Sequence, residues 1–120
     1  PAPVPLIAFH GREDDTVPYA GGRAGKQGHF YVSVNESIAF WVKTNQGSQP
    51  PDRERMMDGT VMKETWNPGD GRREVVLYTL EGWKHTLPTR HFTRALPDTE
   101  PLKGFDATGI LWEFFKTHHR

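Results

Sequence analysis

Apolar residues fall into short blocks whose spacing is strand-like in some segments and helix-like in others. Residues 5–10 (PLIAFH) form a nearly continuous apolar run, which is typical of a strand buried on both faces of a parallel sheet. Residues 60–66 (TVMKETW) alternate as in a strand with one wet side, and residues 74–80 (EVVLYTL) carry the strongest strand pattern. Between them, residues 67–71 (NPGDG) are turn-forming, so we expect these two strands to form a hairpin.

Two segments have the spacing of amphipathic helices. Ser33 and Glu36 match a capping box, which predicts a helix from about residue 34 to 45. Asp106 or Thr108 can cap a final helix. The predicted apolar faces are Val34, Ile38, Trp41 and Val42 in the first helix, and Ala107, Ile110, Leu111, Phe114 and Phe115 in the second.

The remaining segments, 11–32, 46–58 and 81–104, are rich in loop-forming residues and are predicted to be loops. The order strand, helix, strand, strand, helix predicts an α/β fold. We see no repeat and no internal boundary, so residues 1–120 are interpreted as one domain.

Candidate chemistry follows two of the predicted strands. In open α/β sheets, functional residues gather in loops at the carboxyl ends of strands. Residues 11–15 (GREDD) bring carboxylates after the first strand, and residues 81–88 (EGWKHTLP) bring His85 after the strongest one. If these strands are parallel neighbours, an acid and an imidazole meet at one sheet edge. Such an acid fixes the tautomer of the imidazole, whose other nitrogen can take a proton from a nucleophile.

Three stretches resemble one family, the poly(3-hydroxybutyrate) depolymerase and feruloyl esterase type of α/β-hydrolase. FHGREDDTVPYAGG (residues 9–22) resembles its acid loop, VVLYTLEGWKHTLP (75–88) its histidine loop, and FDATGILWEFFKTH (105–118) its closing helix. They occur in the family's order and span nearly the whole chain. The resemblance implies the C-terminal half of an α/β-hydrolase sheet, with parallel strands plus a hairpin flanked by two helices.

Matched position by position, the family's catalytic acid falls on Asp14 and its catalytic histidine on His85. Tyr19 matches a shaping position of the acid loop, and Trp83 replaces a residue that is usually small beside the histidine. The resemblance therefore implies Tyr19 and Trp83 as candidate substrate-binding residues.

The family also requires a nucleophilic serine in the pattern Gly-x-Ser-x-Gly. The chain has only Ser33, Ser37 and Ser48, and none has that context. We therefore expect an N-terminal half of the same hydrolase, or a second copy of this chain, to supply the serine and the oxyanion hole, and we expect this chain alone to be inactive. The implied reaction is hydrolysis of feruloyl, acetyl or polyester-type carboxylic esters without a cofactor, in a secreted or periplasmic protein.

Composition excludes several other classes. The 15 basic and 15 acidic residues give a formal net charge of zero, which removes the usual electrostatic basis for binding nucleic acid or an anionic membrane surface. The absence of cysteine excludes disulfides, thiolate metal sites and a cysteine nucleophile.

Other interpretations of the acid cluster stay open. Glu13 and Asp15 are rivals of Asp14 that we expect to be solvated or to shape the loop. His10 with these acids matches no strong metal motif, and we expect it to be packed and hydrogen-bonded. The alternative function is a non-catalytic binding or assembly module that keeps half of the hydrolase sheet, whose exposed edge invites another chain.

Overall fold

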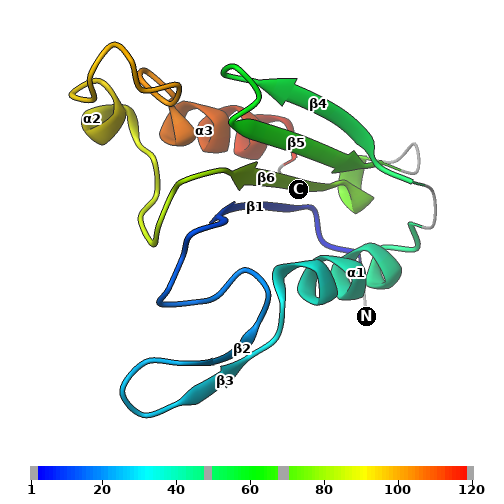
Figure 1. Cartoon of the computed structure of the whole chain (residues 1–120). Coiled ribbons are helices and arrows are strands. Elements are labelled where there is room, and N and C mark those ends of the chain that lie inside the picture. The colour runs from blue at the N-terminus through cyan, green and yellow to red at the C-terminus, as the bar shows by residue number, and fades with distance from the viewer. Residues whose placement is uncertain (1–2, 48–49, 68–70, 119–120) are drawn as a thin grey trace.

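The computed structural model describes residues 3–47, 50–67 and 71–118 of the chain (Figure 1). Its main element is a four-stranded sheet in the order β1-β6-β5-β4, accompanied by a separate ribbon of β2 and β3. The strands are β1 (Leu6–Gly11), β2 (Gly22–Ala24), β3 (His29–Tyr31), β4 (Asp52–Met56), β5 (Val61–Trp66) and β6 (Val75–Leu80). The helices are α1 (Val34–Thr44), α2 (Arg90–Thr93) and α3 (Ala107–Thr117), with a 3-10 turn at Gly71–Arg73.

The sheet is mixed. β1 runs parallel to β6, with Ala8 opposite Leu77 and Gly11 opposite Leu80, whereas β6, β5 and β4 pair antiparallel. The predicted α/β class, the hairpin of β5 and β6, and the parallel pairing of the first strand with the strongest one are therefore confirmed. The predicted turn at residues 67–71 lies partly outside the described residues, because 68–70 are not described.

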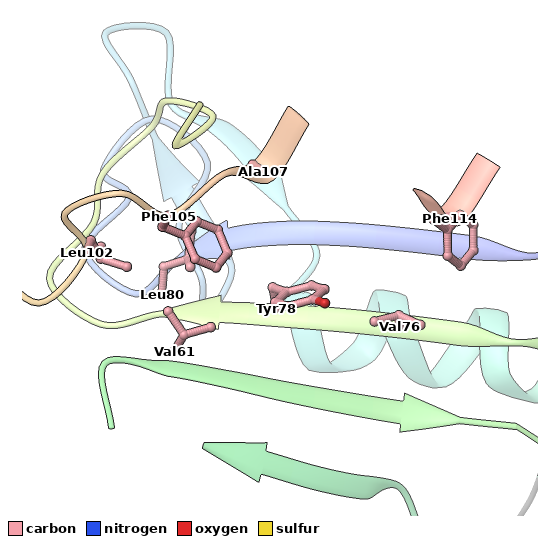
Figure 2. Close-up of a cluster of buried hydrophobic side chains, with 8 residues drawn as sticks. All are labelled: Val61, Val76, Tyr78, Leu80, Leu102, Phe105, Ala107 and Phe114. Atoms are coloured by element: carbon pink, nitrogen blue, oxygen red, sulfur yellow. The ribbon is translucent and has the colours of Figure 1, made fainter. Parts of the chain in front are cut away.

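The sheet lies between two helices, with α1 on one face and α3 on the other (Figure 1). Side chains along β6 alternate between them: Val75 and Leu77 join the cluster against α1, and Tyr78 and Leu80 join the cluster against α3. Figure 2 shows this second cluster, in which Phe105 and the start of α3 lie over the strands. Burial on both faces explains why the β6 sequence is apolar at nearly every position.

Side-chain caps begin both long helices. Ser33 Oγ accepts a hydrogen bond from Glu36 N at 3.1 Å, and Asp106 Oδ1 accepts one from Gly109 N at 3.0 Å. The predicted start of the first helix is thus correct, and of the two candidate caps of the last helix Asp106 is the one used. Helix α1 ends at Thr44, with Asn45 as its C-cap.

Three predicted loops contain regular structure, which corrects the sequence-based assignment. The ribbon of β2 and β3 lies within 11–32, β4 lies within 46–58, and α2 lies within 81–104. In β4 the residues Asp52 to Arg55 are all exposed and charged, so no apolar alternation marks the strand. Its conformation comes from backbone pairing with β5, which a local pattern does not reveal.

The predicted apolar face of the last helix is wrong at Phe115, and the partly buried Leu111 does not join the core cluster. Ala107 and Phe114 are buried and Ile110 packs beside them, but Phe115 is 58% exposed. The stripe that contacts the sheet is therefore narrower than the sequence pattern indicates.

The two edges of the sheet differ in character. The β4 edge carries four consecutive charged residues, a common defence against unwanted strand pairing. The β1 edge consists of Leu6, Ile7, Ala8 and Phe9, and among the described residues no strand pairs with its outer side. The uncharged β1 edge is thus the one at which another strand can be added.

Asn45 joins the helix α1 to the segment that leads into β1. Its side chain is fully buried, Nδ2 donates to Val4 O at 2.7 Å and to Arg73 O at 3.3 Å, and Oδ1 accepts from Val4 N at 3.0 Å. The buried amide of Asn45 is therefore fully hydrogen-bonded, and it ties the end of α1 to the backbone that leads into β1 and β6.

We predict that Asn45→Ala lowers the free energy of unfolding by about 1–3 kcal/mol, because it removes three hydrogen bonds made by a fully buried side chain. Asn35→Ala makes the same chemical change on the exposed surface of α1 and should alter stability by at most about 0.5 kcal/mol. Urea unfolding of both variants measures the difference, and equal effects would contradict the role assigned to Asn45.

Candidate active site

The loops that follow β1 and β6 lie together because the two strands are parallel and end side by side. We call residues 12–19 the acid loop and residues 81–88 the histidine loop. Arg12 N donates to Leu80 O at 2.9 Å, and Glu13 N donates to Trp83 O at 3.1 Å. The Arg12 guanidinium also pairs with Glu81, with Nε 3.2 Å from Oε1. Backbone and side-chain contacts therefore join the two loops where they leave the sheet.

Asp14 is held by its own loop and faces His85. Its side chain is only 5% exposed. Oδ1 accepts hydrogen bonds from Thr16 N at 2.9 Å and Val17 N at 2.8 Å, which orients the carboxyl group. Oδ2 lies 2.8 Å from His85 Nδ1. The acid and the imidazole that the sequence places at this sheet edge are thus in contact, and we call them the Asp14–His85 pair.

The structure distinguishes Asp14 from the acids on either side of it. Glu13 and Asp15 are exposed, whereas Asp14 is buried. Of the three acids, Asp14 is the one that is hydrogen-bonded to the imidazole. This placement agrees with the position at which the sequence resemblance puts the acid.

Opposing influences set the ionisation of Asp14. Burial favours the neutral form, but hydrogen bonds from Val17 N, His85 and Thr16 N outweigh it and lower the pKa of the carboxyl group from its usual 3.8. Near neutral pH the carboxylate can only accept hydrogen bonds. His85 Nδ1 must therefore carry the proton in their contact, which leaves the lone pair of neutral His85 on Nε2.

His85 Nε2 is available for chemistry. The His85 side chain is 52% exposed, and among the described residues no hydrogen bond to Nε2 is found. The pair opens into a hollow of about 340 Å³. Its other lining residues are Phe9, His10, Gly11, Val17, Lys84, Thr86 and Leu87.

Tyr19 and Trp83, the two residues predicted to bind substrate, make contacts that hold the acid loop and the histidine loop in place. The Tyr19 hydroxyl hydrogen-bonds Thr79 Oγ1 at 3.0 Å, and its carbonyl accepts from Val34 N at 2.9 Å. Trp83 packs against the α3-side core, and its Nε1 donates to Thr86 O at 2.7 Å. Neither side chain is among the described residues that line the hollow, so substrate contact by Tyr19 or Trp83 stays a prediction.

Gly11 is a positioning residue that sequence reasoning left unassigned. A Cβ on Gly11 would lie 2.0 Å from Trp83 O and 2.7 Å from Lys84 O, so only glycine lets the histidine loop cross the end of β1 this closely. A glycine directly after a strand and before an acid cluster is the signal that could have identified it.

No described serine belongs to the site. Ser33 caps α1 and Ser37 is exposed on the same helix, while Ser48 lies outside the described residues. Within the described part of the chain, no three His, Cys, Asp or Glu side chains gather closely enough to hold a metal ion. Nor does any described helix have the length and apolar character needed to cross a membrane.

Comparison of the chain with known protein families, with characterised proteins and with solved structures finds no match. The hydrolase family therefore stays a prediction, supported by the sequence motifs and by the geometry of the Asp14–His85 pair.

We predict that Gly11→Ala separates the acid and histidine loops and destabilises the chain by about 1–3 kcal/mol, because the added methyl group overlaps backbone atoms. Nitrogen-15 NMR of the histidine rings should show that His85 loses its preference for a proton on Nδ1. The control is Gly25→Ala, which strains an exposed turn (φ 80°) but places no atom within 4 Å of another group. An unchanged His85 signal in Gly11→Ala would contradict the close approach.

The lowered pKa of Asp14 predicts an acid-sensitive contribution to stability. Because the folded pKa lies below the unfolded value of 3.8, this contribution is complete above pH 3.8 and is lost as pH falls through the folded pKa. In Asp14→Asn the free energy of unfolding should therefore decrease less steeply as the pH falls below about 4. Urea unfolding from about pH 2 to 6 tests this, and the exposed Asp15→Asn should keep the slope of the unmodified chain. Parallel curves for Asp14→Asn and the unmodified chain would refute the assignment.

Proposed function

We propose that this chain is the C-terminal part of a serine carboxylic-ester hydrolase and supplies the acid and the base of its catalytic triad. One observation carries the proposal: buried Asp14 holds His85 through Nδ1 at 2.8 Å, while Nε2 is left for a nucleophile beside an open hollow. A pairing needed only for stability would not require the second nitrogen to remain accessible.

In the proposed reaction, His85 Nε2 accepts the proton of a serine hydroxyl as the serine oxygen attacks the ester carbonyl. Asp14 stabilises the resulting imidazolium without taking its proton. When the tetrahedral intermediate collapses, His85 returns the proton to the leaving alcohol. Water then hydrolyses the acyl-enzyme with the same base, which restores the serine.

The serine and the oxyanion hole come from outside this chain in the proposal. The outer edge of β1 supports this arrangement, because it is apolar, is unpaired among the described strands and lies beside the acid loop. A strand added to that edge would end near the Asp14–His85 pair if it ran parallel to β1. We propose the N-terminal half of the same hydrolase as that partner, with a second copy of this chain as the rival.

Carboxylic esters are the proposed substrates. The resemblance of both loops to the depolymerase and feruloyl esterase family supports feruloyl, acetyl or polyester-type esters, cleaved without a cofactor in a secreted or periplasmic protein.

A purely structural assembly module is the alternative. The apolar β1 edge favours association under either hypothesis. The ionised, buried Asp14 aligned on His85 favours the hydrolase, because assembly through a strand edge does not need such a pair.

The test uses the reading frame that encodes the chain. We expect the sequence preceding Pro1 to contain a strand, a Gly-x-Ser-x-Gly turn and a helix, and the longer protein to hydrolyse p-nitrophenyl acetate. In that protein, His85→Gln should lower kcat by on the order of 10⁴-fold or more, and Asp14→Asn by on the order of 10³–10⁴-fold. A fluorophosphonate probe should label the upstream serine.

Asp15→Asn is the matched control, because it makes the same change at the exposed neighbouring acid, and its activity should stay within about twofold of the unmodified enzyme. The present chain alone should give no turnover above that of its own His85→Gln variant. Activity of the longer protein that survives both His85→Gln and Asp14→Asn would exclude the proposed roles.

A further inference from the structure

We propose that His10 is a positioning residue, which locks the acid loop so that Asp14 faces His85. This inference rests on the proposed function, and it assigns a role to a second imidazole that the Ser-Asp-His scheme does not use. His10 lines the same hollow as the Asp14–His85 pair, and its side chain is 18% exposed.

The position of the His10 proton follows from its partner. His10 Nε2 lies 2.8 Å from Val17 O. A backbone carbonyl only accepts hydrogen bonds, so Nε2 must carry a proton and donate it. The same nitrogen lies 3.4 Å from Asp14 Oδ2, the oxygen that accepts the hydrogen bond from His85 Nδ1. The His10 ring therefore lies next to the carboxylate oxygen that faces His85, while its proton is used to hold Val17.

Val17 connects His10 to the carboxyl group of Asp14. Its carbonyl is held by His10, and its N–H donates to Asp14 Oδ1 at 2.8 Å. Rotation of the carboxyl group away from His85 would break the bonds from Val17 N and Thr16 N. Because His10 fixes the carbonyl of Val17, it limits the loop movement that would permit such a rotation.

His10 is itself anchored to the sheet. It lies on β1 opposite Thr79 of β6, and its ring and that of Tyr19 pack in a T-shaped arrangement with centroids 5.7 Å apart. The Tyr19 hydroxyl in turn binds Thr79 at 3.0 Å. His10 thus connects the acid loop to the parallel strands β1 and β6. Its backbone cannot shift without disturbing the hydrogen bonds between these strands. Three donors then hold the carboxylate, namely two backbone N–H groups and His85 Nδ1, and His10 holds the carbonyl of the residue that supplies one of them.

The experiment compares two carboxamides at position 10 of the full chain. Gln can place its amide nitrogen near the position of Nε2, whereas Asn ends one methylene short of Val17 O. Long-range proton–nitrogen NMR at about pH 8.5, where free imidazoles are neutral, reports which nitrogen of each ring carries the proton. We expect His85 to hold its proton on Nδ1 in the unmodified chain and in His10→Gln, and to lose this preference in His10→Asn.

A structural role for position 10 that did not involve the hydrogen bond would give the same result for Asn and Gln. Retention of the His85 Nδ1 proton in His10→Asn would therefore overturn the inference and leave the proposed function standing. If His85 lacks the Nδ1 proton in the unmodified chain, the proposed catalytic pair and the inference both fail.

The unmodified chain offers a second measurement that does not depend on the folding of any variant. The contact with Val17 O requires the His10 proton to be on Nε2, so the same spectrum should show His10 and His85 as opposite tautomers. A His10 proton found on Nδ1 would overturn the inference even if the Asn variant failed to fold.

Discussion

The parallel pairing of β1 with β6 is the constraint on which the rest of the site depends. Asp14 and His85 are 71 residues apart in the chain, and they meet because parallel neighbours end at the same edge of a sheet. If β1 and β6 were antiparallel, their following loops would lie at opposite ends of the strands. The same pairing brings Trp83 O over Gly11. The close approach at Gly11 and the position of His85 therefore both result from the pairing of β1 with β6.

The cost of burying Asp14 is offset locally rather than by the whole fold. A carboxylate taken out of water is unfavourable unless donors replace its hydration. Backbone donors from Thr16 and Val17 replace part of it, and His85 replaces part, so the carboxylate stays ionised while its direction is fixed. Because two of these three donors belong to one short turn, the orientation of the acid depends on that turn keeping its shape.

The two edges of the sheet differ in how readily they would accept another strand. Charged side chains along β4 oppose further pairing there, whereas the apolar β1 edge permits it. The edge strand that is open to pairing, β1, is also the strand that leads into the acid loop. A proposed partner that supplies the nucleophile would therefore bind where a partner that completes the sheet would bind. In this interpretation the chain becomes active only when the sheet is completed.

The sequence by itself determined the features that depend on local patterns. The apolar runs of β1 and β6, the Ser33 and Asp106 caps, and the presence of an acid and a histidine after two strands could all be predicted, because each reflects neighbouring residues. Tertiary structure decided the rest. β4 is a strand because β5 pairs with it, Phe115 is exposed because the sheet contacts only part of α3, and Gly11 matters because the distant backbone of Trp83 passes close to it. Those outcomes depend on contacts between segments, which no short stretch of sequence contains.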